Sequence, residues 1–451
     1  MNRLHGTLGS ATLAVAALGG ILAAQQPVAK APVLVTGARI LDVEQGRYLP
    51  PAAIFVKDGR IANVAPQPPA SLPAGATQVK ADGAVVVPGL FDAHAWAAPT
   101  GDLDADYFYL MALAHGVTGV RVLNVRTNWG VSQRDRAASG AILAPRIWTS
   151  GRGINRGASP DRWLFDAPST ASAGDEVARQ SAAKVNWIAG YDAIGPDIYA
   201  AIVEGARRSG VRVSGMPGAS SMADLASAGV SSIETLAWPI KAGPGSADSA
   251  WPTASPDTLS TLLSRLVRAR VTLVPLMAAA RARAFPEEAS KDPSLALLPD
   301  GRRAAFVAGL AKLPKADVAA ARRSWTSQAA FLRQFVRAGG KVAAGTGFDL
   351  GGYPVPGAGL HTELAALVRA GLTQGEALRA ATVTPAELVG AKQGVTSFTP
   401  GTEANFIIVS GDPLKQIEDL ARITTVVRAG EVLDPKDLLA RARRTVGPAS
   451  K

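Results

Sequence analysis

The residues best placed to do chemistry lie in the stretch VVVPGLFDAHAWAAP, residues 85–99. Its apolar first half is typical of a buried β-strand, and the strand pattern ends in Asp92, His94 and Trp96. Alternate residues of a strand point to the same side, so histidines at both 94 and 96 would form a pair of metal ligands. Position 96 is Trp, and the stretch therefore offers a single imidazole.

The composition limits the chemistry available elsewhere in the chain. The 451 residues include no cysteine, which excludes disulfides, thiolate metal sites and a Cys nucleophile. The chain has only four histidines, which are His5, His94, His115 and His361. Because imidazole is the usual ligand of catalytic zinc, this scarcity restricts any metal site.

The formal net charge of +11 predicts a basic surface. No basic block is interleaved with aromatic residues and no recognition motif accompanies the charge, so we expect no nucleic-acid partner. Weak attraction to an acidic membrane or wall surface stays open.

Residues 1–24 have the pattern of a secretory signal peptide: Arg3 near the start, a long stretch of small apolar residues, and Ala23-Ala24 before a polar residue. We expect cleavage near Ala24 and export to the periplasm or the outside of a bacterial cell. A membrane anchor is the alternative, but the Ala- and Gly-rich stretch is only weakly hydrophobic. No other segment is long and apolar enough to span a bilayer, which predicts no integral membrane segment after signal removal.

Strand and helix patterns divide the rest of the chain. Several β signals precede Pro88-Gly89, and strand-like runs then alternate with Ala- and Leu-rich helical stretches. Such alternation predicts an α/β fold with a parallel sheet, and about eight units favour a closed (β/α)8 TIM-type barrel. The predicted parts are a small β-sandwich domain from both ends of the chain (33–88 and 394–435), the barrel (89–393) and a basic C-terminal tail (436–451). The Pro-, Gly- and Ser-rich stretch 238–256 is predicted to be a long loop and a candidate lid.

The order and spacing of several motifs resemble the amidohydrolase superfamily, in its imidazolonepropionase-like and Xaa-Pro dipeptidase-like branch. The resemblance covers about residues 33 to 435. It rests on VVVPGLFDAH, AHGVTGVRVLNV, VNWIAGY, GVRVSGMPG, AGVSSIETLAWP, GGKVAAGTGFD and FTPGTEANFIIVSGDP, among others.

The resemblance implies hydrolysis by one or two divalent metals such as zinc, held at the carboxyl ends of the barrel strands. The implied ligands are two His on the first strand, a carboxylated Lys on the fourth, one His each on the fifth and sixth, and an Asp on the eighth. The matching positions of this chain hold His94, Trp96, Ala189, Met216, Thr235 and Gly347. Five of the six positions are substituted, so we expect no metal cofactor and interpret His94 as a core or pocket histidine.

The substitutions also predict how the former metal space is filled. We expect the indole of Trp96, helped by Met216, to occupy it, because an emptied pocket is costly. The predicted pocket is lined by His94, Trp96, Tyr191, Met216, Thr235 and Asp349.

A relocated hydrolytic site stays open, with His94 and Asp349 as its catalytic candidates. Asp349 lies two residues past Gly347 and could turn inward, whereas Asp92 is expected to tie its strand to neighbours. Strand alternation predicts that Glu234 points outward, away from Thr235. His115 and His361 are expected to be structural or to lie outside the ligand set. Ser214, Ser220 and Ser221 lack a nucleophile-elbow motif.

Three functions therefore compete. The favoured one is an exported amidohydrolase-family protein that has lost metal-dependent hydrolysis and binds a small molecule or peptide at the barrel mouth, or pairs with a copy of itself or an active paralogue. The second is an active hydrolase of amide, peptide or lactam bonds with a rearranged site. The third, a surface adhesion module, rests on net charge alone.

Overall fold

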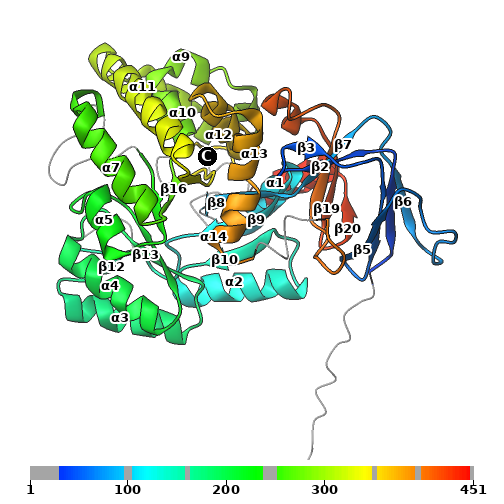
Figure 1. Ribbon diagram of the computed structural model, residues 1–451, viewed down its shortest axis with the longest axis horizontal. Coiled ribbons are helices and arrows are strands. Elements are labelled where there is room, and N and C mark those ends of the chain that lie inside the picture. Colours follow the sequence, from blue (N-terminus) through cyan, green and yellow to red (C-terminus); the bar gives the residue numbers. More distant parts are fainter. Residues whose placement is uncertain are drawn as a thin grey trace, which may run out of the picture.

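The computed structural model of the chain describes residues 30–95, 104–157, 163–236, 251–347, 353–391 and 398–446. In Figure 1 the helices gather around one set of strands on the left, and a β-rich part lies on the right. The signal-peptide prediction for residues 1–24 falls outside the described residues, as do Trp96, Asp349 and most of the predicted loop 238–256. No helix in these described ranges is long and apolar enough to cross a membrane.

Eight strands of the described residues follow one another in chain order with parallel pairing. They are β8 (Leu90–Ala95), β9 (Val117–Val122), β10 (Arg146–Thr149), β13 (Trp187–Gly190), β14 (Arg212–Gly215), β15 (Ser232–Glu234), β16 (Thr272–Val274) and β17 (Lys341–Val342). Two short strands, β11 (Ile154–Asn155) and β12 (Phe165–Asp166), pair beside β13. The predicted α/β barrel architecture with parallel strands is confirmed.

The barrel is not closed as one continuous ladder among the described residues. The strands form a sheet ordered β10-β9-β8 and a second sheet ordered β12-β11-β13-β14-β15-β16-β17. A single parallel bridge between Ser150 and Trp187 joins them on one side. On the other side the amide of Ala93 donates to the carbonyl of Ala344 at 2.8 Å, beyond the end of β17. The interruption arises because β17 is only two residues long and β8 carries register shifts.

Helices cover the strands, and several of them bury one apolar stripe. In α4 (Pro196–Arg208), Ile198, Ile202 and Ala206 lie four residues apart and are all buried. Proline at the first position starts α4, and capping boxes start α5 (Met222–Ala228) and α13 (Gln374–Ala380).

The other helices around the barrel are α1 (Ala105–Ala114), α2 (Thr127–Ser139), α3 (Thr170–Ala182), α7 (Pro256–Arg268), α8 (Met277–Ala284), α9 (Pro286–Ala289), α10 (Asp300–Ala311), α11 (Lys315–Arg337), α12 (Ala358–Arg369) and α14 (Val383–Leu388), with a 3-10 turn η1 (Pro293–Leu297).

The β-rich part combines both ends of the described chain. One sheet has the order β5-β4-β1-β6 and the other β20-β19-β18-β7-β2-β3. Their bounds are β1 (Val33–Thr36), β2 (Arg39–Asp42), β3 (Arg47–Tyr48), β4 (Ala53–Lys57), β5 (Arg60–Ala65), β6 (Thr77–Lys80), β7 (Val85–Pro88), β18 (Phe406–Val409), β19 (Ile423–Arg428) and β20 (Glu431–Leu433), with a 3-10 turn η2 (Ile417–Ala421). The antiparallel pairing of β18 with β7 brings the two ends together.

A glycine stands where the chain first passes from this part into the barrel. Gly89 stands between β7 and β8, and a Cβ there would lie 2.0 Å from the hydroxyl oxygen of Thr118. Only glycine therefore allows β8 to approach β9 this closely.

The last described residues are helical. The stretch expected as a basic tail over 436–451 forms most of α16 (Pro435–Thr445), which packs against α1. Leu438 and Ala442 are buried four residues apart on one face, and most of the basic residues of the helix, Arg441, Arg443 and Arg444, lie beside or after Ala442.

Candidate functional site at the carboxyl ends of the strands

The described positions that match metal ligands in the resembled pattern lie at or just past the carboxyl ends of barrel strands. His94 is in β8 and Ala189 in β13. Met216, Thr235 and Gly347 follow the ends of β14, β15 and β17. The carboxyl ends of parallel strands face one side of a barrel, so these positions belong to its mouth.

The imidazole of His94 is held by a carboxylate that strand alternation had placed on the outside. His94 Nδ1 lies 2.7 Å from Glu234 Oε2, and the two side chains are only 1% and 2% exposed. Because an ionised carboxylate only accepts hydrogen bonds, Nδ1 carries the proton and donates. The prediction that Glu234 points outward is therefore wrong.

Arg121 of β9 completes a buried charged cluster. Its Nη2 donates to Glu234 Oε1 at 2.7 Å, its Nη1 to Ser232 Oγ at 2.9 Å, and its Nε to the carbonyl of Ala93 at 2.5 Å. Ser232 in turn donates to Glu234 Oε1 at 2.5 Å. The guanidinium carbon lies 4.6 Å from the ring centre of Trp187. Each nitrogen of the Arg121 guanidinium is thus bonded: one donates to the carboxylate of Glu234, and the other two donate to the Ser232 hydroxyl and the Ala93 carbonyl.

This arrangement sets the charge state of Glu234. Burial alone would raise the pKa of its carboxyl. Arg121, His94 and Ser232 outweigh that effect and hold the pKa of Glu234 below its usual range. The carboxylate is thus ionised inside the barrel and balances the charge of Arg121.

One polar atom of the cluster is left over. His94 Nε2 is buried and has no hydrogen-bond partner among the residues that the structure describes. Buried polar groups are nearly always paired, so this atom needs an explanation. With Nδ1 protonated and the ring neutral, Nε2 carries a lone pair that can accept a hydrogen bond or a proton.

Two further carboxyl groups are buried in the barrel. Asp92 accepts the backbone N–H of His94 at 3.0 Å and the hydroxyl of Thr346 at 2.6 Å, and so ties β8 to the segment after β17, as expected. Glu363 of α12 accepts the N–H groups of Met277 and Ala278 at 3.0 and 2.6 Å, at the start of α8. Burial raises the pKa of Asp92, and it raises the pKa of Glu363 to about 8.

Apolar side chains fill the space around the substituted positions. Ala189, Tyr191 and Trp187 belong to one buried cluster, and Met216 packs against it half-buried. The predicted contribution of Trp96 lies outside the described residues, so the filling of the former metal space by Trp96 and Met216 together stays a prediction.

Thr235 departs from strand geometry. Its φ is +67°, a left-handed value that is rare for a β-branched residue and costs about 1–2 kcal/mol. Its amide still donates to the carbonyl of Val274 at 2.7 Å, so the pairing with β16 persists. Strain of this kind is concentrated at functional sites.

The residues present do not fit a metal centre. At the described strand ends, Ala189 and Gly347 have no donor atom, and Met216 and Thr235 offer only weak ones. His94 Nε2 is the one free imidazole nitrogen there, and across the described ranges no three His, Cys, Asp or Glu side chains are grouped so as to hold a metal ion. The second catalytic candidate of a relocated site, Asp349, lies outside the described residues.

The other candidates have local partners. Ser214 and Ser220 donate to the carbonyls of Ile188 and Ile194, and Ser221 caps α5. His361 Nε2 lies 2.8 Å from the carbonyl of His115, away from the mouth. The hydroxyls of these three serines are therefore bonded elsewhere, and none of them forms a triad with His94.

Sequence reasoning missed Arg121 and misplaced Glu234. Both are charged residues inside short apolar strands, in GVRVLNV and SSIETL. A charge within a buried strand requires a partner, and this signal could have paired the two.

Comparisons with known proteins agree with this architecture. A family model described as "Amidohydrolase family" matches residues 248–433. An adenine deaminase of Paracoccus denitrificans is 30% identical over 174 residues, which cover 35% of this chain and 28% of that protein. The match thus spans less than a third of the length of this curated relative.

Solved structures are similar over nearly the whole fold. A protein of Bifidobacterium longum provisionally named a prolidase has a TM-score of 0.71 at 24% identity and covers 92% of this chain and 100% of its own. A Xaa-Pro dipeptidase with bound methionine has a TM-score of 0.69 at 18% identity, over 90% and 100% of the two chains. A bottromycin amidohydrolase has a TM-score of 0.70 at 21% identity, over 93% and 91%. At these identities the likeness shows a shared fold.

Proposed function

We propose that this chain is an exported binding protein of the amidohydrolase family that has lost metal-dependent hydrolysis. The proposal is supported by the residue types found at the carboxyl ends of the described barrel strands. Where the resembled pattern has ligands, Ala189, Met216, Thr235 and Gly347 supply no ligand set, and the remaining imidazole is locked to Glu234. Export rests on the signal-like pattern of residues 1–24.

The proposed ligand is a small molecule or peptide at the barrel mouth. His94 Nε2 would accept a hydrogen bond from it, which explains why this buried atom has no partner among the described residues. Tyr191 and Met216 would contact its apolar part. Pairing with a second copy, or with an active paralogue, is the alternative use of the same face.

The residues around His94 have positioning roles in this proposal. Glu234 fixes the ring through Nδ1, and Arg121 with Ser232 fixes Glu234. The lone pair of Nε2 is therefore presented in one orientation, at little cost in side-chain entropy when a ligand binds.

One observation favours a second function, the hydrolysis of C–N bonds without a metal. An imidazole whose Nδ1–H donates to a carboxylate and whose Nε2 is free has the arrangement of a general base. In that case Nε2 of His94 would take a proton from water as the water attacks a carbonyl carbon, and Glu234 would stabilise the imidazolium. The imidazolium would then give this proton to the leaving nitrogen as the C–N bond breaks, which returns the ring to its neutral form. The described residues offer no hydroxyl nucleophile beside it.

An assay with matched variants separates the two functions. The purified protein is incubated with Xaa-Pro dipeptides and N-acyl amino acids, with chelator or with added zinc or manganese. His94→Gln is compared with His361→Gln, which changes a histidine distant from the mouth. We expect no turnover above the blank in any sample, and ligands found by thermal-shift screening that bind wild type and His361→Gln but not His94→Gln.

Two outcomes would contradict the binding proposal. Turnover in chelator that His94→Gln abolishes and His361→Gln retains would establish the metal-free hydrolase. Turnover that needs added metal would show that a metal site persists in spite of the five substitutions.

A further inference from the structure

The face of the barrel opposite the mouth carries a pocket of about 390 Å³. Its lining comes from the amino ends of consecutive strands: Arg212 starts β14, Ser231 directly precedes β15, Thr272 starts β16 and Lys341 starts β17. The last residues of α7 and α14 complete the wall. This pocket is therefore separate from the mouth, where the same strands end.

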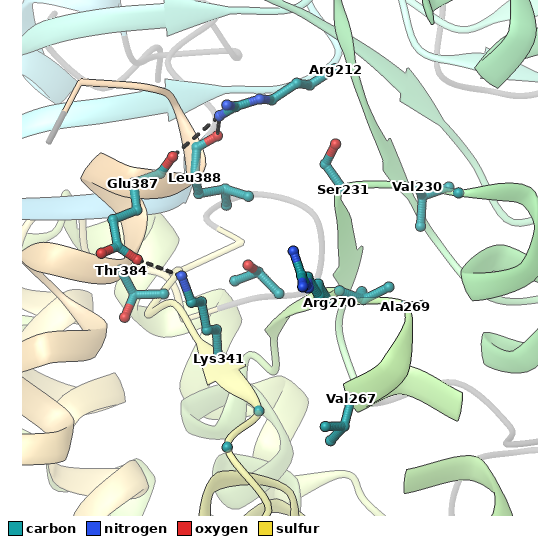
Figure 2. A pocket seen from close by; sticks show the side chains of 15 residues that line it. Arg212, Val230, Ser231, Val267, Ala269, Arg270, Lys341, Thr384, Glu387 and Leu388 are labelled. Carbon is teal, nitrogen blue, oxygen red and sulfur yellow. Dashed lines mark hydrogen bonds and ion pairs between the residues drawn. The ribbon is translucent and has the colours of Figure 1, made fainter. Parts of the chain in front are cut away.

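Three cations and one carboxylate line this amino-end pocket. Lys341 Nζ lies 2.7 Å from Glu387 Oε2, and Arg212 Nη1 donates to the carbonyls of Glu387 and Leu388 at the end of α14 (Figure 2). Lys341 therefore neutralises Glu387, the one carboxylate among the lining residues. Arg212 satisfies the carbonyls of Glu387 and Leu388, which would otherwise repel an anion.

Arg270 is the cation left without a counter-charge. It follows α7 in a left-handed conformation with a φ of +56°, and within the described ranges no carboxylate pairs with it. Figure 2 shows its side chain extending into the space between Ser231 and Lys341. The lining thus has a net charge of +2, from three cations and one carboxylate.

Hydroxyl donors surround the same space. Ser231, Thr272 and Thr384 all line the pocket, and their hydroxyls have no protein partner in the described part of the chain. Ser231 precedes β15, Thr272 starts β16 and Thr384 lies in α14, so these residues reach the pocket from three separate elements. A carboxylate ligand is planar and accepts along two directions, whereas a tetrahedral oxyanion accepts along several.

We propose that the amino-end pocket binds the phosphate group of a small phosphate monoester. Arg270 would provide the main charge contact, with Lys341 beside it, and Ser231, Thr272 and Thr384 would donate to the phosphate oxygens or to hydroxyls of the ligand. A volume near 390 Å³ lies in the range of small-molecule sites. The proposal does not depend on the function assigned to the mouth.

Calorimetric titration of the full chain at constant ionic strength tests the proposal. The probes are inorganic phosphate, glycerol 3-phosphate and acetate, and the variants are Arg270→Gln, Thr272→Val and Arg268→Gln. Arg268 is the matched control, because it is the last residue of α7, two positions before Arg270, and does not line the pocket. Binding of glycerol 3-phosphate should weaken by about tenfold or more in Arg270→Gln, since a hydrogen bond to a charged group is lost, and by about threefold to tenfold in Thr272→Val.

Each result decides the proposal. Phosphate and glycerol 3-phosphate should bind while acetate does not, and Arg268→Gln should behave as wild type. Equal losses in Arg268→Gln and Arg270→Gln would show general attraction to a protein of charge +11 and overturn the proposal. Binding to phosphatidate vesicles without binding of the soluble probes would assign the phosphate contact to a lipid headgroup and would also overturn it.

Discussion

The two ends of strands β14 to β17 use polar residues in opposite ways. At the carboxyl ends, Glu234 is bonded to Arg121 and His94, and only one atom of that described cluster lacks a partner. At the amino ends, Arg270 and three hydroxyls face a pocket without protein partners in the described residues. Bonded polar groups stabilise the barrel, whereas groups that stay unbonded beside open space mark places where a ligand can bind.

The largest effect should come from breaking the cluster at the mouth. Arg121→Met leaves the Glu234 carboxylate buried without its counter-charge, which should lower the free energy of unfolding by about 3–5 kcal/mol. Urea denaturation followed by circular dichroism measures this loss. The exposed Arg303 of α10, paired with Asp300, provides a control, and Arg303→Ala should unfold like wild type.

A double variant tests whether Arg121 and Glu234 stabilise the fold as a buried ion pair. Replacing both partners, in Arg121→Met with Glu234→Leu, should recover much of the lost stability, since no charge is then buried. A double variant as unstable as the sum of the two single variants would contradict the ion-pair interpretation of the cluster.

The second-largest effect is a pH dependence of the free energy of unfolding that arises from Glu363. Its folded-state pKa of about 8 lies above the ordinary value near 4.5, so the folded chain holds this proton more tightly than the unfolded chain. The contribution of this proton to stability is fully present below pH 4.5 and is lost as the pH rises through 8, and it amounts to about 5 kcal/mol at most.

Glu363→Gln tests this pH dependence. The variant should show a weaker fall of the denaturation midpoint between pH 5 and 8 than wild type, while Glu287→Gln, at an exposed position, should match wild type. Parallel curves for Glu363→Gln and wild type would show that Glu363 ionises normally in the folded chain.

A smaller effect is expected at His94. His94→Gln removes the donor to Glu234 but leaves Arg121 in place, so the free energy of unfolding should fall by about 1–2 kcal/mol. Thermal unfolding monitored by fluorescence measures it. A loss as large as that of Arg121→Met would mean that the imidazole, and not the guanidinium, balances the carboxylate.

The smallest effect on stability belongs to the amino-end pocket. Arg270 is exposed and unpaired within the described ranges, so Arg270→Gln should leave the urea midpoint unchanged within error while it weakens phosphate binding. A clear loss of stability without any change in phosphate binding would show that Arg270 has a structural role.

The sequence allowed the strand–helix order to be predicted, because apolar runs and helical faces recur from β8 to α14. It also placed positions 189, 216, 235 and 347 at strand ends. The orientation of Glu234 could not be read, since alternation assumes an extended strand through residue 235. Alternation within β15 puts Glu234 on the same side as Ser232, inside the barrel, and Thr235 leaves the alternation through its left-handed φ of +67°.

Other features depended on contacts across the fold. The amino-end pocket assembles residues 212, 231, 272, 341 and 384 from separate elements, which only the barrel topology brings together. The interruption of the hydrogen-bond ladder between β17 and β8 could not be predicted, because β17 has only two residues and is too short to give a periodic hydrophobic pattern.

Metal stoichiometry tests the central claim most directly. The purified protein is soaked with zinc and with manganese, desalted, and its metal counted per chain by mass spectrometry, with His94→Gln treated in parallel. Loss of the ligand set predicts a value near zero in both proteins. A value near one or two that falls in His94→Gln would contradict the claim and would show a working metal site at the mouth of the barrel.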